Sequence, residues 1–245
     1  MIVNHTDKGY DIITHYAHGL QTAQIGQYLK MDYRPKYWLS TLCAMIEHDD
    51  EQLNFENDNN VSENGIPLDF EKIDVDLDDV LERCKRVMVQ SRTRSQWVAL
   101  IIAHHLEFLY KDLSDQNDKL GDFFVELHDL KIRFRKSYKI KAEESLKYYQ
   151  LLKFCDRCSL ILSKNEVPSG GRKLEINSSI DGFKYFIYNS KGTNHIEPWP
   201  FIKDEFSIFT EVYSFEELQF NSSTELKKKI FTKSPLIREF KLSRD

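Results

Sequence analysis

The sequence predicts a mainly α-helical fold to which both ends of the chain add a small β-sheet. Apolar residues recur with helical spacing from about residue 16 to residue 163. After a Pro-Ser-Gly-Gly interruption at residues 168–171, segments rich in aromatic and β-branched residues predict strands. At the other end, two short apolar segments flank Asp7-Lys8-Gly9, a sequence typical of a hairpin turn.

The elements follow one another in a simple order. Helices are predicted over residues 18–29, 38–46, 77–90, 95–111, 119–136 and 142–163, with a further short helix over 226–231. Strands are predicted over residues 1–5, 10–14, 184–188, 206–213 and 236–242. The Asn-rich, polar residues 51–66 predict a long loop. We therefore expect a helical domain with its hairpin over residues 1–168, and a β-rich region over residues 169–245 packed on it.

Composition narrows the functional classes. A hydrophobic share of 41% can fill a core, and a net charge of −5 argues against general nucleic-acid binding. No stretch approaches the roughly 18 to 20 apolar residues of a membrane span, and the first residues lack the features of a signal peptide. The cysteines fall within helical patterns and do not indicate a disulfide framework. A cytoplasmic protein is expected, and a homo-oligomer is left open.

Histidines and aspartates stand out where the predicted helices begin, end or are interrupted. His18 opens the first helix, His48 and Asp49 close the second, and Asp156 interrupts an otherwise apolar helix. Such groups are unfavourable in an apolar helix unless they are paired or coordinated. Imidazole nitrogen and carboxylate oxygen together suit a divalent transition metal such as iron, manganese, zinc or nickel. These residues are therefore candidate metal ligands.

Two alternatives and one ambiguity accompany these candidates. The acids at the end of the second helix could simply terminate it, although acids there oppose the helix dipole. Asp156 could instead form a buried ion pair with an arginine. The candidates for that pair are Arg83, Arg86 and Arg133. His104 and His105 lie in the most apolar helix and point roughly 100° apart, so at most one faces a given site.

The order of these groups resembles the HD-domain superfamily of metal-dependent phosphohydrolases over about residues 15–163. A single histidine is followed by a His-Asp pair, a histidine-bearing helix and a late aspartate. More narrowly, the chain is similar to a bacterial family of unassigned function with an HD-like core. The matching segments are Met1-Ile2-Val3, Glu47-His48-Asp49-Asp50, Pro67-Leu68-Asp69-Phe70, Asp156-Arg157-Cys158-Ser159-Leu160 and Pro198-Trp199-Pro200-Phe201.

The resemblance implies a site with one or two metal ions. The implied ligands of the first ion are His18, His48, Asp49 and Asp156. His105, and less closely His104, match the additional histidine that some members place near a second ion. Where the nearer relatives have Gly-Trp after the His-Asp pair, this chain has Glu51-Gln52, and Phe55 replaces a later tryptophan. These departures affect the rim of the pocket and hence the substrate.

The implied reaction is hydrolysis by a metal-activated water in line with a phosphorus atom. Asp49 is expected to anchor the metal near that water and Asp50 to orient the water, while Arg157 is a candidate for binding a phosphate oxygen or for a salt bridge elsewhere. Three functions follow. They are a hydrolase acting on a small phosphorylated metabolite or nucleotide, a di-iron oxygenase, and a non-catalytic metal- or ligand-binding regulatory protein. The metal and its count separate the first two, and turnover separates the third.

Overall fold

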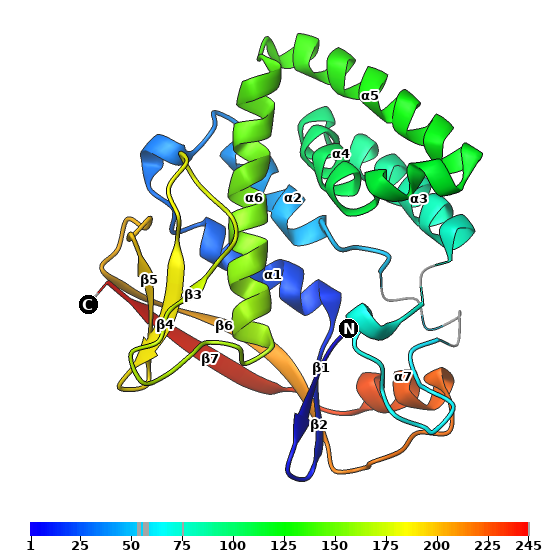
Figure 1. Ribbon diagram of the computed structural model, residues 1–245, viewed down its shortest axis with the longest axis vertical. Helices are drawn as coiled ribbons and strands as arrows, with labels where there is room; N and C mark the ends of the chain where they lie inside the picture. Colours follow the sequence, from blue (N-terminus) through cyan, green and yellow to red (C-terminus); the bar gives the residue numbers. More distant parts are fainter. Residues whose placement is uncertain (53–54, 56–58, 75, 245) are drawn as a thin grey trace.

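The computed structural model describes residues 1–52, 55, 59–74 and 76–244. The helices are α1 (His15–Gly26), α2 (Trp38–Glu47), α3 (Leu77–Arg94), α4 (Gln96–Tyr110), α5 (Asp118–Tyr138), α6 (Ala142–Ser163) and α7 (Ser223–Thr232). The strands are β1 (Ile2–Thr6), β2 (Gly9–Ile13), β3 (Leu174–Glu175), β4 (Phe186–Ser190), β5 (Thr193–Glu197), β6 (Glu205–Phe215) and β7 (Leu236–Ser243). Together with short 3-10 helices, these helices account for 51% of the described residues. Figure 1 shows their arrangement.

The strands form one seven-stranded mixed sheet in the order β1-β2-β6-β7-β5-β4-β3, curved into a half-barrel. Its neighbours are antiparallel except for β5 and β7, which run parallel. The N-terminal hairpin joins the C-terminal strands through β2 and β6, where Tyr10 pairs with Phe215. The prediction of a mainly α fold with a small appended sheet is therefore wrong.

The size of the sheet was underestimated because two of its strands have no strand-like sequence. β3 has two residues, and β5 reads Thr-Asn-His-Ile-Glu. Two polar residues of β5, Asn194 and His195, are buried because their side chains find partners across the sheet. Asn189 Nδ2 donates to Asn194 Oδ1 at 3.0 Å, and His195 Nδ1 lies 3.0 Å from the Ser243 carbonyl oxygen. Hydrogen bonds thus stabilise a strand that apolar alternation does not indicate.

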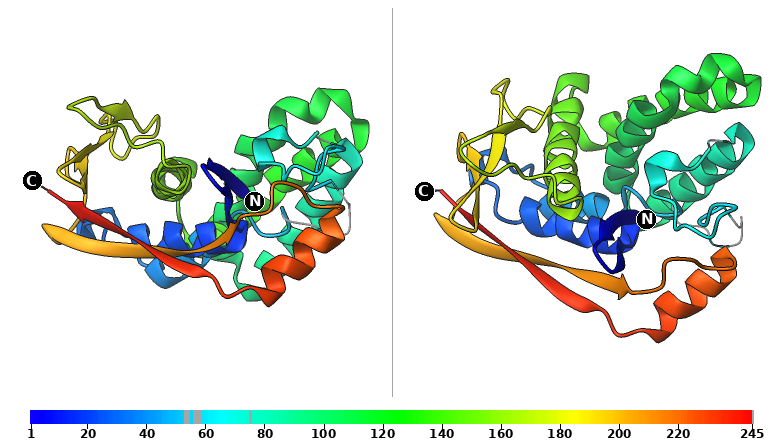
Figure 2. Two further views of the ribbon diagram at one scale, coloured as in Figure 1. Left: turned by 90° about the horizontal axis from the view of Figure 1, so that it is seen from below. Right: turned by 60° about the horizontal axis from the view of Figure 1, so that its bottom comes forward.

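Helix α6 lies in the hollow of the sheet. Figure 2 (left) shows it end-on, with β1 and β2 on one side, β3 to β5 on the other and β6 and β7 beneath it. Helix α1 contacts both α6 and β6, so it lies between the central helix and the sheet. One continuous apolar core joins Phe154 of α6 to Ile187, Ile196 and Ile208 of the strands. The helical and β-rich regions therefore share their core.

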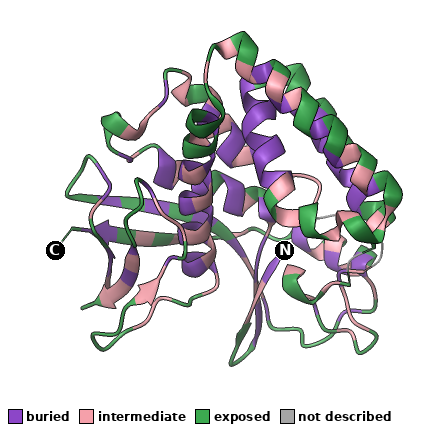
Figure 3. Cartoon of the chain, turned by 45° about the horizontal axis from the view of Figure 1, so that its top comes forward, coloured by how far each residue is buried: buried purple, intermediate pink, exposed green. Residues whose placement is uncertain are grey.

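The remaining helices differ in how much of their surface is buried. Every residue of α4 from Trp97 to Leu106 is buried, so this helix lies inside the molecule. In α5 the buried side chains recur three or four residues apart, which is the single stripe of an amphipathic surface helix. Figure 3 shows this contrast between the central helices and the outer one. Each predicted helical segment is confirmed to within a few residues.

Two further features bear on the sequence predictions. The loop predicted over residues 51–66 includes residues 53–54 and 56–58, which lie outside the described residues, while residues 61 and 67 form an isolated bridge. Among the described residues, no helix is both long enough and apolar enough to cross a bilayer.

Candidate metal centre

The candidate metal centre lies where α1, α2 and α6 meet. His18 lies one turn into α1, His48 and Asp49 directly follow α2, and Asp156 lies in the buried middle of α6. Helices α1 and α2 can approach closely because Gly19 has no side chain. A Cβ atom at that position would lie 2.1 Å from the Ile46 carbonyl oxygen. The glycine next to His18 therefore allows the contact that places His18 beside His48.

The four predicted ligands of the first ion converge. His18 Nε2 lies 3.0 Å from Asp156 Oδ1 and 3.8 Å from Asp49 Oδ2. His48 Nε2 lies 3.3 Å from Asp156 Oδ1 and 3.4 Å from Asp49 Oδ2. One donor atom from each residue lies within 4.8 Å of all the others. The histidines are fully buried, whereas the carboxylate side chains keep 11% and 12% of their surface exposed, so the centre opens on its carboxylate side.

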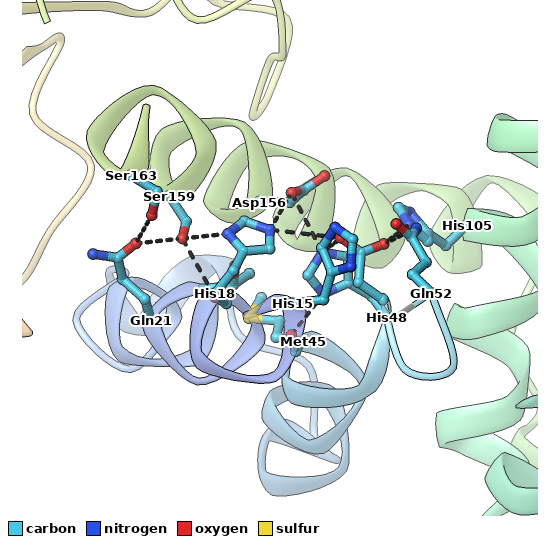
Figure 4. A network of polar contacts seen from close by, with 12 residues as sticks. His15, His18, Gln21, Met45, His48, Gln52, His105, Asp156, Ser159 and Ser163 are labelled. Carbon is cyan, nitrogen blue, oxygen red and sulfur yellow. Dashed lines mark hydrogen bonds and ion pairs between the residues drawn. The ribbon is translucent and has the colours of Figure 1, made fainter. Parts of the chain in front are cut away.

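A chain of hydrogen bonds behind His18 fixes which ring nitrogen carries the proton. Figure 4 shows Gln21, Ser159 and Ser163 on the side of His18 that faces away from His48. The Ser159 and Ser163 hydroxyls donate to Gln21 Oε1 at 2.7 and 2.8 Å. Since the Ser159 hydroxyl proton is used there, Ser159 Oγ accepts from His18 Nδ1 at 2.8 Å. His18 Nε2 is then the nitrogen available for a ligand.

The tautomer of His48 is fixed in the same way by the backbone. His48 Nδ1 lies 2.8 Å from the Met45 carbonyl oxygen, which can only accept, so Nδ1 carries a proton. His48 Nε2 has no aligned hydrogen-bond partner among the described residues, although two carboxylate oxygens lie near it. Both histidines therefore direct Nε2 at carboxylates. An Nε2 atom that faces carboxylate oxygens needs positive charge between them, which either a proton on Nε2 or a metal ion in its place would supply.

The electrostatics of the cluster favour such a cation. Burial by itself lowers the pKa of His48, but the charges of Asp49 and Asp156 outweigh it and raise that pKa to about 9. Burial by itself raises the pKa of Asp156, but the His48 charge and the hydrogen bond with His18 hold it below its usual range. The pKa of Asp49 is likewise lowered, against the effect of burial, chiefly by His48. The site therefore attracts positive charge.

The spacing of the donors fits a metal ion. Zinc-like ions bind histidine nitrogen and carboxylate oxygen at about 2.0–2.2 Å, which places neighbouring ligands of a tetrahedral site roughly 3.3–3.6 Å apart. The four distances in the cluster, from 3.0 to 3.8 Å, lie around these values. Two imidazoles and two carboxylates are also the donor types that divalent transition metals accept. The cluster could thus hold a metal ion, whose identity the donors do not fix.

The adjacent histidines of α4 have different surroundings. His105 is buried, its Nε2 lies 3.6 Å from Asp49 Oδ1, and that nitrogen has no hydrogen-bond partner in the described part of the chain. Its Nδ1 lies 3.4 Å from the Tyr149 hydroxyl. His104 instead places Nε2 3.1 Å from Ser145 Oγ. The structure therefore brings His105 to the centre and directs His104 elsewhere.

The other predicted site residues lie at the edge of the centre. Asp50 is half-buried, and burial followed by the charge of Glu47 raises its pKa to about 6. Arg157 is half-buried one position after Asp156, and no ion pair joins it to a described carboxylate. The alternative in which an arginine pairs with Asp156 is not observed among the described residues, because His18 and His48 occupy that carboxylate.

Several residues at the centre were not predicted from the sequence. His15 is buried, its Nε2 has no hydrogen-bond partner among the described residues, and burial holds its pKa well below the usual value. Gln52 Nε2 donates to Asp49 Oδ1 at 2.6 Å. The Gln21, Ser159 and Ser163 network had a sequence signal. Asp156, Ser159 and Ser163 recur at the i, i+3, i+7 spacing of one helix face in an apolar helix.

Comparisons with known proteins give a family and no activity. No curated protein and no solved structure matches the chain. A family model described as "Protein of unknown function (DUF3891)" matches residues 1–217, which covers the helical region and the sheet as far as the end of β6. The metal cluster lies within this match. The chain therefore belongs to the DUF3891 family.

Proposed function

We propose that the protein is a metal-dependent hydrolase, acting on a small phosphorylated molecule, and that His18, His48, Asp49 and Asp156 hold its metal ion. One observation carries this proposal. Both histidines have Nδ1 bonded to the protein and Nε2 directed at buried carboxylates, an arrangement that a bound cation would stabilise. When bound, a divalent ion of this type supplies a water nucleophile by lowering the pKa of the water towards neutrality.

The residues of the chain have distinct parts in this proposal. The Ser159 hydroxyl and the Met45 carbonyl hold the two imidazole rings in orientation before any ligand binds. Asp49 and Asp156 supply negative charge on the side of the cluster that is open to solvent. The orientation of a water molecule by Asp50 and the binding of phosphate by Arg157 stay predictions from the sequence. HD-superfamily membership also stays a prediction, since the comparisons bear on the DUF3891 family alone.

A two-ion centre and the related oxygenase function have one observation in their favour. Asp49 presents Oδ2 to His18 and His48, and Oδ1 to His105 Nε2 at 3.6 Å. A carboxylate placed in this way could bridge two ions. A di-iron oxygenase would use such a pair, whereas the hydrolase needs one activated water.

Elemental analysis of purified protein, followed by a screen of phosphorylated compounds for phosphate release, tests the proposal. One divalent ion per chain together with metal-dependent phosphate release supports the hydrolase. Two irons per chain without phosphate release would favour the oxygenase. Bound metal without turnover on any compound would favour a binding or regulatory protein. The absence of bound metal under metal-replete conditions would contradict the hydrolase and the oxygenase and leave only a protein that binds another ligand.

A further inference from the structure

Arg83 is a buried arginine with an incomplete set of partners. It lies on α3 and is 6% exposed. Its Nε donates to the Asp50 carbonyl oxygen at 3.2 Å, and its Nη1 donates to the Tyr110 hydroxyl at 2.9 Å. Within the described part of the chain, Nη2 has no hydrogen-bond partner and no carboxylate forms an ion pair with this side chain. Two neutral oxygens therefore face a guanidinium group that carries a full positive charge.

A buried guanidinium in these surroundings is unfavourable without an anion. Arginine stays protonated in proteins, so it cannot relieve the cost of burial by losing its proton. Buried charges in proteins are paired, and a buried donor left without an acceptor is unfavourable in addition. Among the described residues, Arg83 thus has neither a direct ion pair nor an acceptor for its Nη2 group, and an oxyanion would supply both.

Arg83 lines a cavity of about 210 Å³ beside the candidate metal centre. A water molecule needs at least roughly 10–15 Å³ measured in this way, so the cavity has room for a polyatomic anion. Two contacts join it to the centre. Gln52 lines the cavity, and its Nε2 donates to Asp49 Oδ1. Asp50, whose carbonyl oxygen accepts from Arg83 Nε, directly follows Asp49. An anion bound to Arg83 would therefore lie next to the metal-binding residues.

The outer part of the cavity restricts what else the ligand carries. Its rim includes the exposed carboxylates of Asp74, Asp76 and Asp79, and its wall includes the half-buried, apolar Phe70 and Ile73. The exposed Arg86 on the rim is paired with Glu51, so the three aspartates leave the rim acidic. Such a rim would repel a second anionic group, such as the further phosphates of a nucleoside triphosphate. A neutral or cationic remainder suits both the rim and the apolar wall.

We propose that Arg83 binds an oxygen of the substrate's phosphoryl group, and that the substrate is a phosphate monoester whose remaining part is neutral or cationic. This inference rests on the proposed hydrolase function for the identity of the anion. It replaces Arg157 with Arg83 as the phosphate-binding arginine, because Arg83 is the one that is buried, lines the cavity and has a free N–H group.

Binding of inorganic phosphate, measured by calorimetry on the protein with its native metal, tests the role of Arg83. Arg83→Gln should weaken phosphate binding by about 10- to 100-fold, the usual effect of losing a hydrogen bond to a charged group. Arg86→Gln is the matched control, because Arg86 lines the same cavity but is exposed and bonded to Glu51 at 3.3 Å. It should change phosphate affinity less than about twofold.

Equal phosphate affinity of Arg83→Gln and the wild type would overturn the proposal, as would wild-type protein that carries metal but binds no phosphate at millimolar concentration. If Arg83→Gln does not fold, Arg83→Lys serves instead. It keeps the charge but loses the planar fork, and it should still weaken phosphate binding severalfold. Metal content is measured on every sample. Protein without metal that still binds phosphate through Arg83 would contradict the hydrolase, and of this inference only the anion-binding role of Arg83 would stand.

The substrate class has its own test. Phosphoethanolamine, with a cationic remainder, should bind about two- to fivefold more tightly than phosphoglycolate, with an anionic one, and this difference should shrink as salt is added. Tighter binding of phosphoglycolate would overturn the proposed substrate class. The role of Arg83 is tested separately, by the binding of inorganic phosphate.

Discussion

The metal centre and the neighbouring cavity hold their polar groups in different ways. In the centre, the outer nitrogens of His18 and His48 are bonded to the protein, and the inner nitrogens converge on the carboxylates. In the cavity, two nitrogens of Arg83 donate hydrogen bonds, and the third has no acceptor among the described residues. The donor atoms of the centre therefore converge on one position, as the binding of a single ion requires. The cavity instead offers one N–H donor in a larger space, which suits one group of a larger ligand.

The two adjacent histidines of α4 show the same difference on a smaller scale. His105 faces Asp49 with a nitrogen that has no hydrogen-bond partner in the described part of the chain, and His104 is bonded to Ser145 on another face of the helix. Two histidines that are adjacent in the chain thus differ: one can bind a ligand, and the other forms a hydrogen bond within the protein. The predictions below test whether the surroundings of a residue, rather than its type, decide its part.

The largest effect is expected from Asp49→Ala. Because Asp49 lies near both ligand histidines and His105, its loss should reduce metal affinity by more than the roughly 10- to 100-fold typical of losing a supporting partner, and it should abolish most turnover. Far-UV circular dichroism should change little, since the helices have a separate apolar core. Asp122→Ala, at an exposed position of α5, is the control. Full metal occupancy in Asp49→Ala would contradict the site.

Ser159→Ala should reduce metal affinity by about 10- to 100-fold without removing any ligand, because His18 loses the partner that fixes its ring. Ser163→Ala removes the other hydroxyl bonded to Gln21 but makes no contact with His18, so it should affect the metal less. Metal titration of both variants checks this comparison. Equal affinities in the two would mean that the orientation of His18 does not depend on Ser159.

Gly19→Ala should test whether the centre depends on the close contact of α1 with α2. The added methyl group would meet the Ile46 carbonyl oxygen, so we expect a loss of about 1–3 kcal/mol in the free energy of unfolding together with weaker metal binding. Gly121→Ala is the matched control, because the nearest atom to its added Cβ lies 3.5 Å away, in ordinary contact. Alanine there should stabilise α5 by up to about 1 kcal/mol. Denaturant unfolding measures the stability of both variants. A Gly19→Ala variant with the stability and metal affinity of the wild type would show that the centre does not depend on this close contact.

The smallest and most specific effect is expected from the α4 pair. His105→Gln should lower turnover while changing stability little, since its Nε2 has no bond to lose among the described residues. His104→Gln should lower the free energy of unfolding by about 1 kcal/mol through its bond to Ser145, with unchanged metal content. Kinetics and thermal unfolding of the two variants separate the effects. If His104→Gln lowered turnover and His105→Gln lowered the free energy of unfolding, the roles assigned to the two histidines would be reversed.

Local sequence determined most of the helical half. The periodicity that predicted a helix over residues 142–163 coincides with α6, and the isolated Asp156 within that segment indicated a group that needed a partner. Such signals are local because a helix satisfies its backbone hydrogen bonds within its own segment. The choice of His18, His48, Asp49 and Asp156 as a set came from the resemblance of their order to that in the HD-domain superfamily, and the structure brings these residues together.

The tertiary structure alone decided the sheet and the surroundings of the site. The parallel pairing of β5 with β7 joins segments far apart in the chain, and the polar sequence of β5 carries no sign of it. Arg83, His15 and Gln52 acquire significance only through neighbours on other elements. Sequence alone identifies groups that are unfavourable when buried by themselves. Which of them find partners, and which stay free for a ligand, depends on distances that exist only after the chain has folded.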